Sequence, residues 1–141
     1  MPFQVAPFQV AVCGPRDCSA TEAAHAHRIG QLLAERGAVV VCGGGTGVMA
    51  AVAAVAAGAR SRGGVVVGIR PGGDREGASD DLTAVVVTNL GEARNAVVVW
   101  SADAVVVVGG SWGTLSELAL ARRRGGVPVV SLAVRPACPP A

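Results

Sequence analysis

The sequence predicts an α/β fold in which helices cover both faces of a mostly parallel, open sheet. Short continuous runs of Val, such as those at 39–41 and 105–108, are typical of strands buried on both faces. Segments of helical length separate these runs, and glycine-rich turns follow two of them. Right-handed crossovers between parallel strands would then give a Rossmann-like domain. Because 141 residues are about one domain's length, we expect a single domain over 1–141, with loose tails at 1–6 and 136–141.

The first half of the chain predicts strands and helices in strict alternation. The segment Ser19-Ala20-Thr21-Glu22 matches a capping box, so a helix should begin there and end near Gly37. An Ala-rich run of helical length, 48–59, follows the first glycine turn. The expected strands cover residues 8–13, 38–42 and 64–69.

The second half is less regular. Residues 70–81 form an aperiodic, polar segment, and loops of that length are usually functional or mobile. A strand at 84–88 follows without a helix before it, so its direction and neighbours stay open. Residues 91–102 combine a strand-like Val run with a helix-like start, and we predict a helix. A strand at 104–108, a helix at 115–124 and a strand at 127–133 complete the expected elements.

The composition excludes several kinds of chemistry. All 12 basic residues are Arg, so no lysine is available for a pyridoxal-phosphate aldimine, a Schiff base or a P-loop. A net charge of +2 and an aromatic content of 3% disfavour nucleic-acid and membrane partners. The four Cys lack metal-ligand spacing, so we expect reduced thiols, no metal and no cofactor. Without a basic leader or a membrane-length apolar stretch, we expect a cytoplasmic protein.

Two glycine-rich turns stand at corresponding places, each after a strand and before a helix. One covers 43–47 and the other 109–114. Glycines there let backbone N–H groups converge at a helix N-terminus, which attracts anions. The alternative is that each turn only packs a strand tightly against a helix. The turns indicate a phosphate site and a nucleoside monophosphate or another phosphorylated small molecule as ligand. The candidate ligand-binding residues are Gly44, Gly45, Thr46, Gly47, Gly110, Ser111, Trp112, Gly113 and Thr114.

Two charged residues are the candidate catalytic groups. Glu117 follows Thr114 by three residues, so from the first turn of the helix it should face the same phosphate site as the glycine turn. The alternative is that it is only a first-turn acid favoured by the helix dipole. Arg94 stands at the start of its helix, where a cation gains nothing from the dipole. It is therefore either a ligand-binding group or a solvated surface residue. Trp112 is either a wall of the pocket or an anchor of an interface.

The segment 109–117 resembles the PGGxGTxxE motif of the LONELY GUY family of nucleoside 5′-monophosphate phosphoribohydrolases. Residues 43–49, GGGTGVM, are similar to that family's GGGSxGLMG, and 92–95, EARN, resemble its ERK segment. The chain departs from the pattern in that Gly109 replaces the Pro, Ser111 the second Gly and Asn95 the Lys. In its compact length it looks more like the branch that includes the molybdenum cofactor carrier protein, which binds a phosphorylated pterin.

The resemblance implies either a hydrolase that releases a free purine base and ribose 5-phosphate, or a carrier or sensor without catalysis. In the enzyme, both glycine turns would hold the 5′-phosphate. Glu117 would hold the ribose hydroxyls or orient the attacking water, and Arg94 would bind phosphate or stabilise the departing base. The resemblance also implies a homodimer, for which Val97, Val98, Val99 and Trp100 offer an apolar surface.

Overall fold

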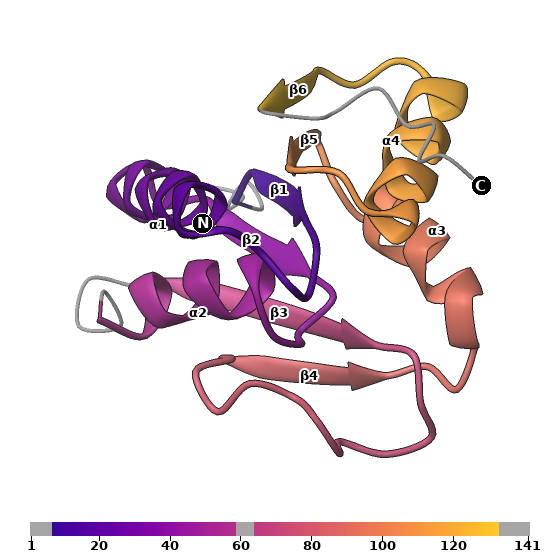
Figure 1. The fold of residues 1–141 in the computed structure, drawn as a ribbon, viewed down its shortest axis with the longest axis horizontal. Coiled ribbons are helices and arrows are strands. Elements are labelled where there is room, and N and C mark those ends of the chain that lie inside the picture. The colour runs from indigo at the N-terminus through magenta and orange to yellow at the C-terminus, as the bar shows by residue number, and fades with distance from the viewer. Residues whose placement is uncertain (1–6, 59–63, 133–141) are drawn as a thin grey trace, which may run out of the picture.

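A computed structural model describes residues 7–58 and 64–132 of the chain. Its six strands form one sheet in the order β4-β3-β2-β1-β5-β6, and every neighbouring pair is parallel (Figure 1). The chain therefore builds the sheet outward from β1 through β4, then returns to the other side of β1 for β5 and β6. The strands are β1 (Gln9–Cys13), β2 (Val39–Cys42), β3 (Val65–Arg70), β4 (Ala84–Val87), β5 (Ala104–Val108) and β6 (Val129–Leu132).

Helices cover both faces of this sheet, as the sequence predicts. The helices α1 (Ala20–Glu35) and α2 (Val48–Gly58) lie on one face and pack against each other. The helices α3 (Arg94–Trp100) and α4 (Trp112–Arg124) lie on the other, and a short 3-10 turn, η2 (Gly91–Ala93), leads into α3. Among the described residues, no helix is both long and apolar enough to cross a membrane.

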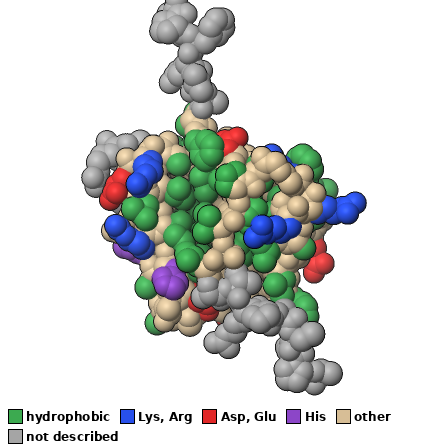
Figure 2. Space-filling view, turned by 90° about the horizontal axis from the view of Figure 1, so that it is seen from above, with side chains coloured by type: hydrophobic (Ala, Val, Ile, Leu, Met, Phe, Trp, Pro, Cys, Tyr) green, Lys and Arg blue, Asp and Glu red, His purple; other side chains and the backbone are tan. Residues whose placement is uncertain are grey.

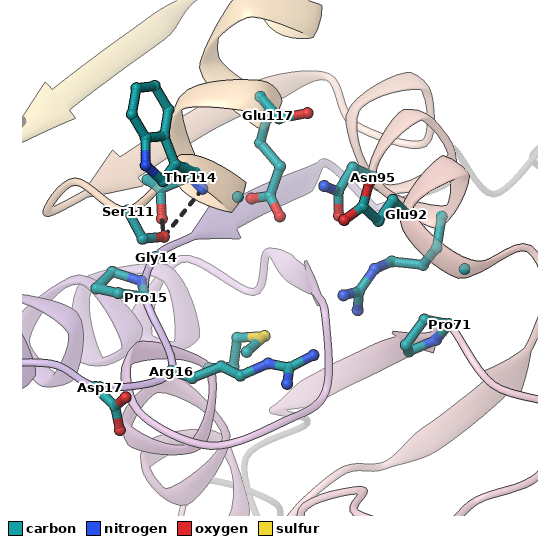
Figure 3. A pocket seen from close by; sticks show the side chains of 16 residues that line it. Gly14, Pro15, Arg16, Asp17, Pro71, Glu92, Asn95, Ser111, Thr114 and Glu117 are labelled. Carbon is teal, nitrogen blue, oxygen red and sulfur yellow. Dashed lines mark hydrogen bonds between the residues drawn. The ribbon is translucent and has the colours of Figure 1, made fainter. Parts of the chain in front are cut away.

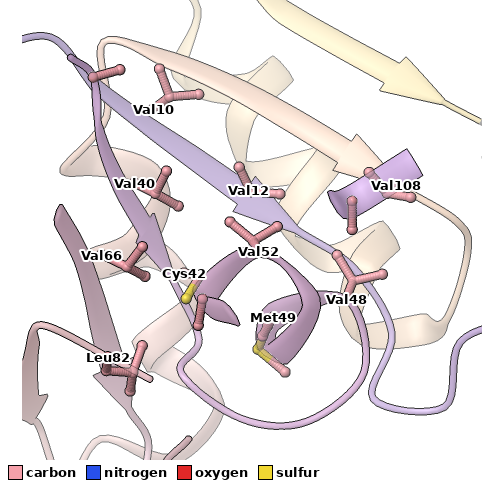
Figure 4. Packing of buried hydrophobic residues seen from close by; sticks show 13 residues of the cluster. Val10, Val12, Val40, Cys42, Val48, Met49, Val52, Val66, Leu82 and Val108 are labelled. Atoms are coloured by element: carbon pink, nitrogen blue, oxygen red, sulfur yellow. The ribbon is translucent and has the colours of Figure 1, made fainter. Parts of the chain in front are cut away.

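Val dominates the core on both sides of the sheet. On the α1–α2 side, Val12, Val40 and Val66 pack against Val48 and Val52 of α2 (Figure 4). On the opposite side, strand residues such as Val105 and Val107 pack against α3 and α4. The alternation of side-chain direction along each strand supplies both layers, so the uninterrupted Val runs are explained by burial on both faces.

The outer surface holds scattered charge. In Figure 2, hydrophobic side chains form a band down the middle of the face seen from above, and acidic and basic side chains stand at its margins. On the edge strand β6, Val130 is 52% exposed.

The Rossmann-like single domain is confirmed, and several boundaries need correction. The strands expected at 8–13, 38–42 and 64–69 cover Gln9–Cys13, Val39–Cys42 and Val65–Arg70. The helix expected at 115–124 begins at Trp112, because Ser111 is its N-cap. The region expected as one helix at 91–102 is split into η2 and α3. The last strand, expected at 127–133, covers Val129–Leu132 within the described residues. The strand expected at 84–88 ends at Val87 and pairs in parallel with β3. The expected tails, as well as Ala59, Ala133 and Cys138, lie outside the described residues.

Candidate functional site

A cavity of about 630 Å³ opens at the carboxyl edge of the sheet. It lies where the chain order reverses, between β1 and β5, which is where open α/β sheets bind ligands. The turn after β1, the start of α3 and the start of α4 supply most of its wall (Figure 3). The lining residues are Gly14, Pro15, Arg16, Asp17, Met49, Pro71, Gly91, Glu92, Arg94, Asn95, Ser111, Trp112, Gly113, Thr114, Ser116 and Glu117.

The N-terminus of α4 forms one wall and presents free amides. The Ser111 side chain caps the helix by accepting a hydrogen bond from the Thr114 amide at 3.2 Å, and its Oγ lies 2.9 Å from Thr114 Oγ1. The amides of Trp112 and Gly113 make no hydrogen bond to the described part of the chain. Two N–H donors, two hydroxyls and the positive end of a 13-residue helix therefore face one opening. This arrangement can bind the oxygens of a phosphate.

Gly109 allows this turn to approach α1. Its φ is +74°, a conformation that L side chains rarely adopt, and an added Cβ would collide with the Glu22 carboxylate. Glu22 is the partner of Ser19 in the α1 capping box, with hydrogen bonds of 2.9 and 3.1 Å. The predicted capping box is thus confirmed. Gly109 stands where the LONELY GUY motif has Pro. In this chain the backbone conformation and the nearby Glu22 carboxylate favour glycine at that position.

Glu117 lines the cavity from the second turn of α4, one turn later than the sequence predicts. It is partly buried, and the thiol of Cys13 at the end of β1 influences its carboxylate. Burial raises the pKa of Glu117 above its ordinary value, while the neighbouring Cys13 thiol and the charge of Arg94 oppose the rise. Burial and the neighbouring carboxylate also keep the pKa of Cys13 well above that of an exposed thiol.

Arg94 lines the same cavity, and one nitrogen of its guanidinium is used within the fold while its Nε is buried without a hydrogen-bond partner. It is 9% exposed, and its Nη1 donates to the carbonyl oxygens of Gly43 and Ile69 at 3.0 and 2.9 Å. Burial lowers the pKa of Arg94 from its ordinary value, and the charge of Glu117 partly opposes this. Arg94 is therefore no solvated surface residue. It braces the carboxyl ends of β2 and β3 beside the cavity.

The first glycine turn is placed differently from the second. Gly44, Gly45, Thr46 and Gly47 are not among the residues that line the cavity, and neither is Gly110. Gly47 has a φ of +70°, and an added Cβ there would collide with the backbone oxygens of Pro15 and Arg16. The amide of Val48, at the start of α2, already donates to the Pro15 carbonyl at 3.2 Å. In this structure the turn packs against the turn after β1 at Gly47, and phosphate binding by Gly44, Gly45, Thr46 and Gly47 stays a prediction.

The structure adds lining residues that the sequence analysis did not single out. The turn at 14–17 directly follows β1, the strand at which the chain order of the sheet reverses. This position after a strand was the signal from which the turn could have been predicted as part of the site. Met49, Glu92 and Asn95 lie in the segments 43–49 and 92–95 that carried the family resemblance, whereas Pro71 reaches the cavity through tertiary packing and carried no local signal. Asn95 is 8% exposed, and its Oδ1 is buried without a hydrogen-bond partner. Such an atom next to a cavity indicates a polar occupant.

Neither Trp belongs to the core. Trp112 lines the mouth and is 66% exposed, while Trp100 is 63% exposed and lies 4.7 Å from the Arg124 guanidinium. The expected apolar surface at 97–100 is wrong for two of its residues, because Val98 and Val99 are buried in the core against β5 and α4. Within the described residues, no group of three His, Cys, Asp or Glu could hold a metal ion.

The fold is that of a single Rossmann-like domain, with a cavity at the carboxyl edge of its sheet. The chain belongs to the SLOG cluster4 family, whose model matches residues 7–138. An uncharacterized protein of Archaeoglobus fulgidus is 41% identical over 118 residues, which span 84% of this chain and 76% of the relative. The more specific resemblance to the LONELY GUY family is not confirmed by these matches.

Solved structures agree with the family assignment. The molybdenum cofactor binding protein of Rippkaea orientalis superposes with a TM-score of 0.85 at 35% identity, covering 91% of this chain and 77% of that one. The molybdenum cofactor carrier protein of Chlamydomonas reinhardtii superposes with a TM-score of 0.79 at 30% identity, covering 93% and 79%. The expected similarity to the carrier branch is confirmed.

Proposed function

We propose that the chain binds a phosphorylated small molecule in this cavity and carries it without turnover, with the molybdenum cofactor as the ligand. The free amides and hydroxyls at the N-terminus of α4 are the observation that supports a phosphate site. The pterin portion of that cofactor would lie deeper, where Asn95 and Glu117 offer polar groups. The similarity to two proteins named for the molybdenum cofactor supports the choice of ligand.

The test is a loading experiment with a charge-matched pair of variants. Purified protein is incubated with molybdenum cofactor and desalted, and retained molybdenum and pterin fluorescence are measured. We expect near-stoichiometric retention.

Gly113 has room for a side chain, since only Ser111 Oγ lies within 4 Å of an added Cβ, at 3.9 Å. Gly113→Asp places a negative charge at the phosphate position, and Gly113→Asn is its neutral isostere. Affinity should fall at least about tenfold in Gly113→Asp relative to Gly113→Asn. Equal retention by both variants would contradict the phosphate position.

Phosphoribohydrolase activity is the second candidate function. A partly buried carboxylate with a raised pKa at the cavity, Glu117, is the observation that favours it. Protein incubated with AMP would then release adenine and ribose 5-phosphate, and Glu117→Ala would lower the rate by about 10² to 10⁴. If chromatography detects no free base with AMP or GMP, this candidate is eliminated and the carrier function stands.

We also propose that the chain forms a homodimer and resides in the cytoplasm. The exposed Trp100 supports the first proposal, since large exposed aromatic residues are enriched at interfaces. Light scattering that shows only monomer would refute the homodimer, and recovery of the protein outside the cytosolic fraction would refute the location.

A further inference from the structure

The side chain of Asn95 is polar and buried, and contacts within the protein do not explain it. It lies in the first turn of α3, is 8% exposed, and its Oδ1 is buried without a hydrogen-bond partner. Its Nδ2 makes no hydrogen bond to the described part of the chain either. Buried amides that stabilise a fold are hydrogen-bonded, so an apolar side chain of the same size would pack here at least as well.

Asn95 lines the cavity on the side away from the proposed phosphate site. Figure 3 shows Ser111 and Thr114 at one side of the cavity and Asn95 at the other, on α3. Pro71 also lines the cavity, on the side of Asn95, and adds apolar surface there. A ligand whose phosphate lies at the N-terminus of α4 would therefore extend its other end toward Asn95.

A primary amide such as that of Asn95 can donate from Nδ2 and accept at Oδ1 at the same time. It can form a pair of hydrogen bonds with a ring edge on which an N–H donor stands next to an acceptor. The lactam edge of a 6-oxopurine or a 4-oxopteridine, an N–H beside a C=O, has this pattern. Rotation about the last bond of the side chain exchanges Oδ1 and Nδ2, so the buried oxygen can be turned to the cavity without any movement of the backbone. The Lys that stands at this position in the LONELY GUY motif can only donate.

The backbone that carries Asn95 is held from both sides. On one side, the Arg94 side chain donates to the carbonyl oxygens of Gly43 and Ile69, which ties the start of α3 to the ends of β2 and β3. On the other, Val99 is buried in the core. The side-chain amide is therefore the part of Asn95 that is free to turn, on a rigid support of the kind that directional recognition needs.

We propose that Asn95 determines which ring the cavity accepts, by pairing its amide with an adjacent N–H donor and acceptor on one edge of the ligand's heterocycle. This inference rests on the proposed binding of a phosphorylated small molecule, and it names the part of the ligand that the α4 site does not contact. A ring without the matching N–H leaves the buried amide unpaired, and sites built on such hydrogen bonds reject such analogues.

The test compares two nucleotides that differ only at this edge, by isothermal titration calorimetry with the full chain. Inosine 5′-monophosphate has the lactam edge, and purine riboside 5′-monophosphate has the same sugar and phosphate without it. We expect a Kd at least about tenfold lower for inosine 5′-monophosphate. In Asn95→Leu, which is of similar size and has no polar atom, the two Kd values should differ by less than about threefold. Gln31→Leu removes a carboxamide of α1 that does not line the cavity, and it should keep the full preference.

Several results would overturn the proposal. One is equal affinity for the two nucleotides in the unaltered protein, and another is a preference that survives in Asn95→Leu. Failure of either nucleotide to bind would also count against it. If Asn95→Leu does not fold, the amide has a structural partner, and the proposal is wrong for that reason.

A second measurement needs no substitution. The side-chain ¹⁵N–H signals of Asn95, assigned through its backbone, should shift on saturation with inosine 5′-monophosphate, and should shift much less with purine riboside 5′-monophosphate. Signals that respond equally to both nucleotides would contradict the pairing. The proposed function fails separately: a chain that cannot retain molybdenum cofactor but prefers inosine 5′-monophosphate rejects only the carrier function. A chain that retains the cofactor but binds both nucleotides equally rejects only the role of Asn95.

Discussion

Replacing Gly109 by Ala tests how the α4 turn is packed against α1. The backbone at Gly109 has a φ of +74°, which costs an L residue about 1–2 kcal/mol. The new Cβ would also collide with the Glu22 carboxylate, which must move and release the Ser19 amide. Loss of a capping interaction costs about 1 kcal/mol. We expect the free energy of unfolding to fall by about 2–3 kcal/mol.

Urea unfolding followed by circular dichroism measures this loss, and Gly37→Ala is the matched control. Gly37 has a φ of +68° with nothing within 4 Å of an added Cβ, so it should show only the backbone cost. A double-mutant cycle adds the specific test: in a Glu22→Ala background, Gly109→Ala should cost about 1 kcal/mol less. Equal losses at Gly109 and Gly37, with no coupling to Glu22, would refute the reasoning.

Three further substitutions have expected outcomes in the same unfolding assay. Ser111→Ala removes the N-cap acceptor of α4 and should cost about 1 kcal/mol, whereas no loss would show that the cap is dispensable. Arg94→Ala leaves the Gly43 and Ile69 carbonyls without their donor and should cost about 3 kcal/mol, against almost nothing for the exposed Arg123→Ala. Because the folded-state pKa of Glu117 is raised, this group stabilises the fold fully below its unfolded pKa of about 4.5 and progressively less as pH rises through the folded value. Glu117→Gln should remove that decline, and an unchanged pH profile would contradict the raised pKa.

Much of the fold follows from patterns that are local in the sequence. The Val runs of β1, β2 and β5, the capping box at Ser19 and the glycine turns fix the order of elements without tertiary information. The direction of β4 was not predictable, because no crossover helix precedes it. The segment before β4 is instead held by tertiary hydrogen bonds, such as Ser79 N to the Gly44 carbonyl at 2.9 Å. The start of α4 was misplaced because a helix that begins at Trp112-Gly113 has a weak local propensity, which the Ser111 cap overrides.

The candidate site, too, was predictable from the sequence in part only. Ser111, Thr114 and Glu117 share one helix, so their spacing indicated a common mouth, and the structure brings them to one cavity. The two glycine turns looked equivalent in sequence. They differ because Gly47 of the turn after β2 packs against the Pro15 and Arg16 carbonyls, while residues 111–114 after β5 line the cavity. The proximity of Cys13 to Glu117 depends on β1 and α4 meeting, which no local pattern encodes.

Titration of the ¹⁵N-labelled protein with inorganic phosphate, followed through its backbone amide signals, tests the proposed phosphate site most directly. We predict that the largest saturable shifts fall on residues 111–114 at the N-terminus of α4, and that Gly113→Asp suppresses them. Shifts centred on residues 44–47, or the absence of any saturable shift, would contradict a phosphate site at α4.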